Sequence, residues 1–346
     1  MNYRSFICLF ISAGFVLLFQ SCKKDNNNNP SAKADVYVAG NVGGAVYWKN
    51  GVMVRLADSA SANSIFVSGN DVYVAGSIND SVVYWKNGIA TYLGASGAAT
   101  SIFVSGSDVY LAASVDNSGK PFINQYNRLT YHPTYWKNST QVTLSNDGTA
   151  RSIFVSGTDV YVAGSDDTNA VYVPTYWKNQ VPTHLQHQPL STYDYYYDEG
   201  ECSSVFVSGA DIYLSGTELY LDGTGSDGSG GDYWKNGKAT ILADGPQWGS
   251  VPYSIFVSEG NVFIAGYTYG TSSLDYATYW KNGTATQLPA DGNSAFALGI
   301  SVLGNDIYVA GYEFLNTAAG RATLWKNSVP TILSDSSGFA TAVFVK

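Results

Sequence analysis

The chain reads Ser-Ile-Phe-Val-Ser-Gly-Asn-Asp-Val-Tyr-Val-Ala-Gly from Ser64 to Gly76 and Tyr-Trp-Lys-Asn-Gly from Tyr84 to Gly88. These runs are rich in β-branched and aromatic residues, and the Gly-Asn and Asn-Gly pairs that bound them are typical of two-residue hairpin turns. The sequence therefore predicts a meander of four antiparallel strands at residues 64–68, 71–76, 82–86 and 89–93.

The same unit recurs along almost the whole chain. Seven of the eight tryptophans stand in this turn sequence, at intervals of roughly 40 to 50 residues, which is the period of propeller blades; they are Trp48, Trp85, Trp136, Trp177, Trp234, Trp280 and Trp325. In this repeat the chain resembles seven-bladed β-propellers. The resemblance implies an all-β fold of four-stranded antiparallel blades, with the tryptophans buried between them.

The two ends of the repeat region are complementary. Residues 35–40 match the second strand of the unit without a first strand before it, and residues 341–345 match a first strand without a second after it. We expect the C-terminal strand to close the first blade, so that residues 35–346 form one propeller.

An aspartate begins the second strand of most copies, and we expect it opposite the lysine of the tryptophan turn. The expected pairs are Asp71–Lys86, Asp108–Lys137, Asp159–Lys178, Asp211–Lys235 and Asp306–Lys326. The sixth copy departs, with Asn261 opposite Lys281. Exposed ion pairs contribute little to stability, and we interpret these as structural.

The N-terminal segment has the pattern of an export signal. A basic start, Met1–Arg4, precedes an apolar run at residues 6–19, which is short for a membrane span. The run ends in Leu-Phe-Gln-Ser-Cys at Cys22, which resembles the lipobox of bacterial lipoproteins. The resemblance implies a signal peptide at 1–21, lipidation of Cys22 and a polar tether at 22–34. It also implies attachment to the bacterial outer membrane through the lipid alone, and the sequence does not indicate which side of that membrane the protein faces. Ordinary secretion is the alternative.

Charge and cysteine content exclude some classes of function. The formal net charge is −9, which argues against binding to nucleic acid. Cys8 lies in the predicted signal and Cys22 carries the predicted lipid, so Cys202 has no partner for a disulfide. No histidine lies close to Cys202 in sequence, so a nucleophilic role for its thiol has little support.

The connections opposite the tight turns vary in length, with insertions at 114–132, 186–202, 217–230 and 243–252. Loops of this kind are typical recognition sites, because rigid strands position them while their sequence is free to differ. Aromatic residues gather there, and tyrosine and tryptophan suit contact with a sugar ring or a protein surface. The candidate ligand-binding residues are Tyr193, Tyr195, Tyr196, Tyr197, Trp248, Tyr253, Tyr267 and Tyr269. The alternative is that these rings pack on one another to hold the loops.

Catalytic and metal sites have weaker signals. A glycoside hydrolase would need one of the loop carboxylates to face a second carboxyl at roughly 5 to 9.5 Å; the candidates are Asp194, Asp198, Glu199 and Glu201, facing Asp166 or Asp244. The first strands, which line the axis of a propeller, carry no ionisable side chain in copies such as 64–68 and 152–156, so we expect an axial site to lack acids and bases. His132, His184 and His187 have no zinc spacing.

Residues 222–232 are rich in oxygen ligands, but Tyr233 stands at the twelfth position, so the EF-hand pattern fails and calcium binding stays open. Because neither the histidines nor this segment matches a known metal-binding pattern, we expect no resident metal or cofactor.

Propellers carry many unrelated activities, so the fold alone does not give a function. We expect a monomeric, non-enzymatic, lipid-anchored envelope protein that binds a glycan or a protein partner through the long loops of blades three to six. The alternatives are a carbohydrate-active enzyme, hydrolase or lyase, that uses the loop carboxylates, and a purely structural envelope component.

Overall fold

A computed structural model divides the chain into two units, residues 1–33 and Ala34–Lys346. The structure describes residues 34–116, 122–123, 129–168, 171–185, 195–221, 227–242, 249–270, 274–291, 293–314 and 320–346. The predicted signal peptide, Cys22 and the tether up to residue 33 lie outside the described residues, so those predictions stay untested.

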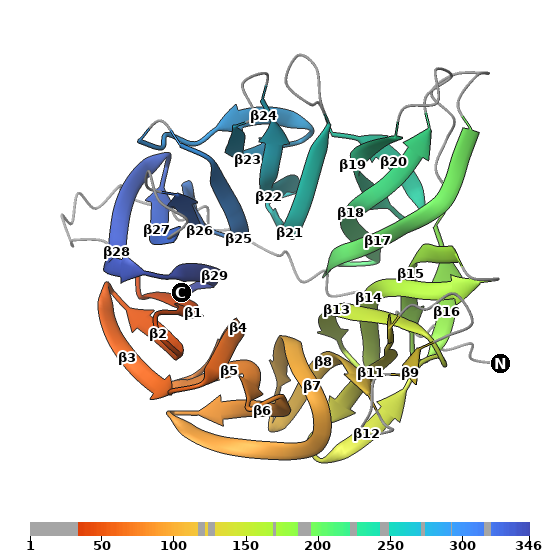
Figure 1. Cartoon of the computed structure of the whole chain (residues 1–346), viewed down its shortest axis with the longest axis horizontal. Helices are drawn as coiled ribbons and strands as arrows, with labels where there is room; N and C mark the ends of the chain where they lie inside the picture. Colours follow the sequence, from red (N-terminus) through yellow and green to blue (C-terminus); the bar gives the residue numbers. More distant parts are fainter. Residues whose placement is uncertain are drawn as a thin grey trace, which may run out of the picture. The chain divides into compact units, whose positions relative to one another are not determined.

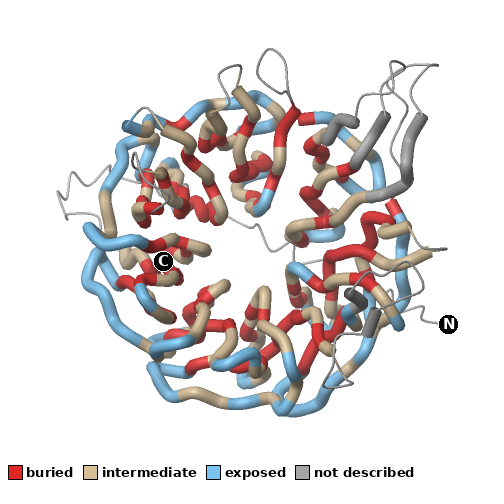
Figure 2. The backbone as a smooth tube through the Cα atoms, viewed as in Figure 1, coloured by how far each residue is buried: buried red, intermediate tan, exposed pale blue. Residues whose placement is uncertain are grey.

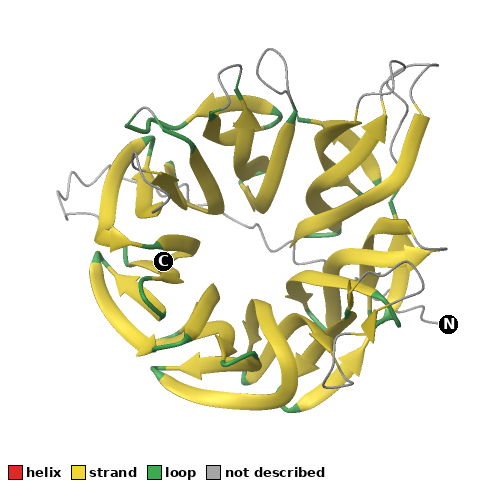
Figure 3. Ribbon diagram, in the orientation of Figure 1, coloured by secondary structure: helices red, strands yellow, loops and turns green. Residues whose placement is uncertain are grey.

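The described part of the second unit is all-β, without a helix (Figure 3). Five sheets have four antiparallel strands, one has seven and one has two. The four-stranded sheets run β29 (Phe339–Val345), β1 (Val36–Asn41), β2 (Ala45–Lys49), β3 (Val52–Ala57); β13 (Gly148–Ser156), β14 (Asp159–Thr168), β15 (Val171–Lys178), β16 (Val181–His184); β17 (Tyr195–Ser208), β18 (Asp211–Leu221), β19 (Asp227–Lys235), β20 (Lys238–Ile241); β21 (Ser250–Ser258), β22 (Asn261–Tyr269), β23 (Asp275–Lys281), β24 (Thr284–Gln287); and β25 (Ala295–Leu303), β26 (Asp306–Phe314), β27 (Gly320–Lys326), β28 (Val329–Ser337).

The seven-stranded sheet differs from the prediction of separate four-stranded blades. It contains β4 (Ala60–Ser68), β5 (Asp71–Ile78), β6 (Ser81–Lys86), β7 (Ile89–Ser105), β8 (Asp108–Asp116), β11 (His132–Lys137) and β12 (Thr140–Thr143). The first part of β7 pairs with β6 and the remainder with β8, so one continuous strand serves two successive copies of the repeat. The short connection of small residues at 94–97 lets the strand continue. The two-stranded sheet pairs β9 (Phe122–Ile123) with β10 (Leu129–Thr130).

We number the copies of the repeat one to seven along the chain, with β1 in the first copy. Each copy has four strands, and we call the first of them in the pairing order, at one edge of the four, the inner strand. The inner strands are β29, β4, the second part of β7, β13, β17, β21 and β25. Figure 1 shows them nearest the centre of the unit. Each inner strand contacts the next one in this order, and β25 contacts β29, so the contacts run in a cycle.

The prediction that the C-terminal strand completes the first sheet is confirmed. β29 pairs antiparallel with β1, with Val36 opposite Val345 and Asn41 opposite Phe339. The backbone bonds between Asp35 and Lys346 extend this pairing to the last residue of the chain. The first and last strands of the unit therefore share one sheet, and β1 has a neighbour on both sides.

The core lies between neighbouring sheets. The seven tryptophans of the repeat are the largest fully buried side chains, each at most 1 % exposed, as predicted. Figure 2 shows the buried residues concentrated along the inner and second strands, and the exposed residues along the outermost strands. Burial of a Trp side chain stabilises a fold by several kcal/mol at about 25 cal/mol per Å².

The asparagine of each tryptophan turn explains why that turn recurs. Asn87 has φ +50°, accepts a hydrogen bond from the backbone N–H of Val72 at 2.9 Å and donates one to Asp71 at 2.8 Å. The predicted ion pairs follow beside it; their N–O distances are 2.8 Å for Asp71–Lys86, 2.9 Å for Asp108–Lys137, 2.8 Å for Asp159–Lys178, 2.8 Å for Asp211–Lys235 and 2.7 Å for Asp306–Lys326. Asp35 and Lys49 add a sixth pair at 3.7 Å.

Serines of the inner strands connect neighbouring copies. Ser64 Oγ accepts a hydrogen bond from the backbone N–H of Ile102 at 3.2 Å, and the same bond joins Ser101 to Ile153, Ser152 to Val205, Ser204 to Ile255 and Ser254 to Ile300. Gly299 and Ala342 stand at this position in the last and first copies. The junctions of β29 with β25 and with β4 therefore lack this bond.

Candidate functional site

Every inner strand carries a β-bulge at the same point of the repeat. In β4 the bulge lies between Ala62 and Ser64, so Asn63 has no partner on β5. The corresponding bulged residues of the seven inner strands are Asn63, Thr100, Arg151, Ser203, Tyr253, Leu298 and Thr341. A bulge redirects a side chain, and here it does so once in every copy.

In six of the seven copies the bulge brings the two strands so close that a Cβ would meet a backbone carbonyl. A Cβ on Gly76 of β5 would meet the carbonyl oxygen of Ser61. A glycine in the same position meets the equivalent carbonyl in five other copies: Gly40, Gly164, Gly216, Gly266 and Gly311. The Ala-Gly pair of the repeat therefore accommodates the bulge, and only the third copy replaces this glycine, with Ala113.

The seven bulged residues line one cavity of about 530 Å³, together with Ala98 and Glu201. Because all seven inner strands contribute, the cavity lies on the axis of the cycle, and we call it the axial cavity. The bulges precede the Ser-Ile-Phe-Val-Ser segments, so the cavity lies at the end of the unit away from the two-residue turns.

One side of the axial cavity is polar. Arg151 Nε donates a hydrogen bond to Glu201 Oε1 at 2.7 Å. The hydroxyl of Thr149 donates to the same oxygen. Three other bulged residues use their side chains to bond to neighbouring backbone: Asn63 donates to Ala99 O, Thr100 to Ala150 O and Thr341 to Ala62 O. Arg151 is the one charged residue among the seven bulged residues.

The opposite side adjoins a cluster of aromatic rings from the sixth, seventh and first copies. Tyr253 lies 6.0 Å from Tyr267 between ring centroids, and Tyr267 lies 4.9 Å from Phe296. The contacts continue through Tyr312 to Phe339. We call Tyr253, Tyr267, Tyr269, Phe296, Tyr312, Phe314 and Phe339 the aromatic cluster. Tyr253 is 38 % exposed and lines the cavity itself.

Three tyrosines of this cluster, Tyr253, Tyr267 and Tyr312, have a raised pKa. Burial raises the pKa of Tyr253 and of Tyr312, and burial and the hydrogen bond with Tyr269 raise the pKa of Tyr267. Burial also raises the pKa of the neighbouring Asp275 carboxyl. At neutral pH the phenol groups therefore stay neutral and can donate hydrogen bonds.

Three predicted ligand-binding residues come together in the aromatic cluster: Tyr253, Tyr267 and Tyr269. Tyr193 and Trp248 lie outside the described residues. Tyr195, Tyr196 and Tyr197 are described only as backbone, within β17. The described rings pack on one another, as the structural alternative requires, while Tyr253 also faces the cavity.

The prediction that an axial site lacks ionisable groups is wrong. Arg151 and Glu201 both lie on inner strands, β13 and β17, and both line the axial cavity. The prediction considered only the five-residue segments such as 152–156. Arg151 lies one residue before that segment, and Glu201 lies three residues before the equivalent segment 204–208. The signal that could have found Arg151 is the position directly before Ser-Ile-Phe-Val-Ser, which varies from copy to copy while the segment after it largely repeats.

The two described carboxylates proposed for hydrolysis each bond to another side chain. Glu201 is bound to Arg151, and Asp166 Oδ2 lies 3.2 Å from His184 Nε2. Asp194 and Asp244 lie outside the described residues, as do the side chains of Asp198 and Glu199.

The described residues also give little support to a metal site or to a reactive thiol. No group of three His, Cys, Asp or Glu side chains there could hold a metal ion. Residues 222–226 of the oxygen-rich segment and His187 lie outside the described residues. Cys202 is fully buried, and burial raises the pKa of its thiol well above the usual range, which makes it unreactive.

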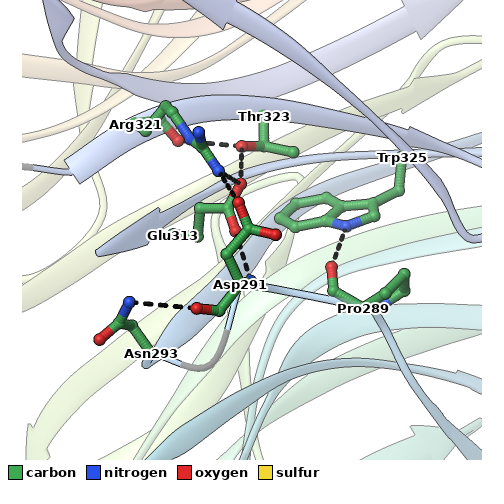
Figure 4. A network of polar contacts seen from close by, with 7 residues as sticks. All are labelled: Pro289, Asp291, Asn293, Glu313, Arg321, Thr323 and Trp325. Carbon is green, nitrogen blue, oxygen red and sulfur yellow. Dashed lines mark hydrogen bonds and ion pairs between the residues drawn. The ribbon is translucent and has the colours of Figure 1, made fainter. Parts of the chain in front are cut away.

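A second polar network, in the seventh copy, is structural (Figure 4). Arg321 Nη2 lies 2.8 Å from Glu313 Oε1 and 2.6 Å from Asp291 Oδ2. The Glu313 side chain is 3 % exposed and also accepts bonds from Thr323 and the Asp291 backbone. Trp325 packs beside the network and donates to Pro289 O at 2.9 Å. The two carboxylates pair with the Nη2 of Arg321, and we interpret the network as structural.

No protein-family model matches the sequence, and no curated protein is similar enough to give a match. Within the described residues, no helix has the length and apolarity that a membrane span requires. Of the features described above, the axial cavity is the one that all seven inner strands line, and we take it as the candidate site.

Proposed function

We propose that residues 34–346 form a seven-bladed β-propeller. The seven-stranded sheet supports this, because β7 divides it into two four-stranded meanders that share one strand. The contacts of the seven inner strands run in a cycle, and β29 joins β1 where the cycle meets itself. Each copy of the repeat then corresponds to one blade.

We propose further that this propeller binds a glycan in the axial cavity, without catalysing a reaction. One observation carries the proposal: six different residue types occupy the seven copies of one repeated position around a single cavity of about 530 Å³, threonine alone occurring twice. A position that serves only the fold would repeat like its neighbours. Cavities of this size with aromatic walls and a few oriented polar groups are typical ligand sites.

A sugar ring fits the two sides of the cavity. Its C–H face packs against an aromatic ring, and its hydroxyl groups exchange hydrogen bonds with polar side chains. Tyr253 offers the ring, and Arg151 and Glu201 offer donors and acceptors on the other side. Hydrolysis of a glycoside needs two carboxyl groups, whereas Glu201 is the one carboxylate among the described lining residues, so the arrangement favours binding.

We also propose that a lipid on Cys22 attaches the propeller to the outer membrane through the polar residues 23–34, as the lipobox-like sequence implies. The protein acts as a monomer, and the glycan belongs to the envelope or to its surroundings. A protein partner on the long loops of blades three to six is the other binding function that the sequence supports.

A glycan array tests the proposal. We expect the purified protein to retain a set of glycans and the Tyr253→Ala variant to bind them about tenfold more weakly, because the stacking face is lost. Tyr92→Ala is the matched control, since Tyr92 is 59 % exposed on the outer part of β7, away from the cavity. Glycan binding that is equal in the wild type and Tyr253→Ala would place the site elsewhere, and an array without retained glycans would refute the function.

A further inference from the structure

One nitrogen of the Arg151 guanidinium, Nε, is hydrogen-bonded within the protein, and the other two nitrogens are available to bind a ligand. Its Nε donates to Glu201 Oε1 at 2.7 Å, and the side chain is 47 % exposed at the cavity. In the described part of the chain, neither Nη1 nor Nη2 has a hydrogen-bond acceptor. Two parallel N–H groups on that edge therefore point to solvent, in the geometry that binds a carboxylate with two bonds.

Glu201 fixes this orientation and is itself fixed. Its Oε1 accepts from Arg151 and from the Thr149 hydroxyl, and that hydroxyl also lies 2.9 Å from Ser165 Oγ. The carboxylate is 28 % exposed, less than the guanidinium. One anion thus orients one cation, and the cation is the more accessible of the two.

Arg151 and the aromatic wall act on the same space. Burial raises the pKa of Tyr253, and the positive charge of Arg151 acts against that rise, so the guanidinium lies within electrostatic reach of the phenol across the cavity. Arg151 is the one cationic side chain among the described lining residues. A ligand that fills the cavity meets an aromatic face and a cation together.

We propose that the axial cavity selects an acidic saccharide, whose uronic-acid carboxylate binds the Nη edge of Arg151 while its ring packs against Tyr253. This inference rests on the proposed glycan-binding function. Glu201 repels the bound acid, so its charge weakens affinity while its hydrogen bond provides orientation. Neutral sugars bind the same wall without the bidentate contact.

The test compares each acid with its own methyl ester, which keeps the shape and removes the charge. Oligosaccharides of glucuronate, galacturonate or mannuronate are titrated into the purified protein by calorimetry, each beside its methyl ester. We expect at least one acid to bind about tenfold or more tightly than its ester. Arg151→Met should remove this preference, because it weakens binding of the acid about tenfold more than binding of the ester.

Two further variants test the charge of Glu201 and the effect of a cation outside the cavity. Glu201→Gln keeps an acceptor for Arg151 Nε and removes the negative charge, so it should raise the ratio of acid affinity to ester affinity several-fold. Arg55→Met is the control, because Arg55 of β3 forms an exposed ion pair with Asp58, away from the cavity. Unchanged thermal unfolding of the Arg151 variant shows that it folds.

The outcomes distinguish the two proposals. Equal binding of acid and ester, both weakened by Tyr253→Ala, overturns the acidic selectivity and keeps the glycan-binding function. An acid preference that survives Arg151→Met also overturns the inference. Failure of every saccharide to bind refutes the proposed function, and the inference with it.

Discussion

Single residues differ in this protein where the surrounding repeat does not. Asn63, Arg151 and Tyr253 occupy equivalent positions, each followed by Ser-Ile-Phe-Val-Ser. The following residues pack between sheets or bond to the next copy, which requires the same side chain every time. The bulged residue differs because its side chain lines the axial cavity, although Asn63, like Thr100 and Thr341, also donates a hydrogen bond to the next copy. Function can therefore change most freely in the copies whose bulged side chain makes no bond to the next copy, as with Tyr253.

The Arg321–Glu313 pair shows the opposite case, a charged group that serves stability. We expect Arg321→Met to lower the free energy of unfolding by about 3 kcal/mol, because it leaves the buried Glu313 carboxylate without its cation. Urea unfolding followed by circular dichroism measures the loss. Lys326→Met, which breaks the exposed pair with Asp306, should change stability little.

The double variant Arg321→Met, Glu313→Gln completes this test. It removes the uncompensated charge, and we expect it to recover much of the lost stability. If Arg321→Met unfolds at the same urea concentration as the wild type, the network contributes nothing and the interpretation is wrong.

At the scale of elements, the bulge and the glycine opposite it form one unit. We expect Gly76→Ala to lower the free energy of unfolding by about 2 kcal/mol or more, since the new Cβ meets the Ser61 carbonyl and the strands must separate. Thermal or urea unfolding measures it. The third copy supplies the control: Ala113 occupies this place naturally, and Ala113→Gly should have a small effect. Equal effects of the two substitutions would contradict the proposed role of the close approach.

The sequence predicted the elements well where turns are short. Gly-Asn and Asn-Gly pairs fix a hairpin locally, so strands such as β5 and β6 lie where the pattern placed them. The 17-residue β7 was not predicted, because its continuity depends on pairing with β8. The axial site was missed for a related reason. A bulge is a property of two paired strands, and without it Arg151 and Glu201 seem to belong to a connection between blades.

At the scale of the whole molecule, the ion pairs of the tight turns predict a pH dependence. Hydrogen bonds from Lys and Asn side chains lower the pKa of Asp71, Asp108, Asp159, Asp211 and Asp306, and the bond from Asn50 lowers that of Asp35. A carboxyl with a lowered pKa in the fold stabilises it above the unfolded pKa, near about 4, and this contribution is lost as pH falls.

We therefore expect the melting temperature to stay level from neutral pH to about pH 5 and to decline below about pH 4. Asp147 and Asp275 have raised pKa values and act in the opposite direction, but they are fewer. Calorimetric scans across this range measure the decline, and about 1 M salt should reduce it. A melting temperature that rises on acidification would contradict the role given to these pairs.

The pairing of β29 with β1 also orders the events of synthesis. β1 leaves the ribosome before every other strand of the unit, and β29 leaves it after all of them. The edge of β1 that pairs with β29 therefore stays unpaired until the whole repeat has been translated. The junctions that form last are also those without an inter-copy serine bond. A nascent chain that ends before β29 thus leaves one edge of β1 unpaired, and such an edge can pair with another chain.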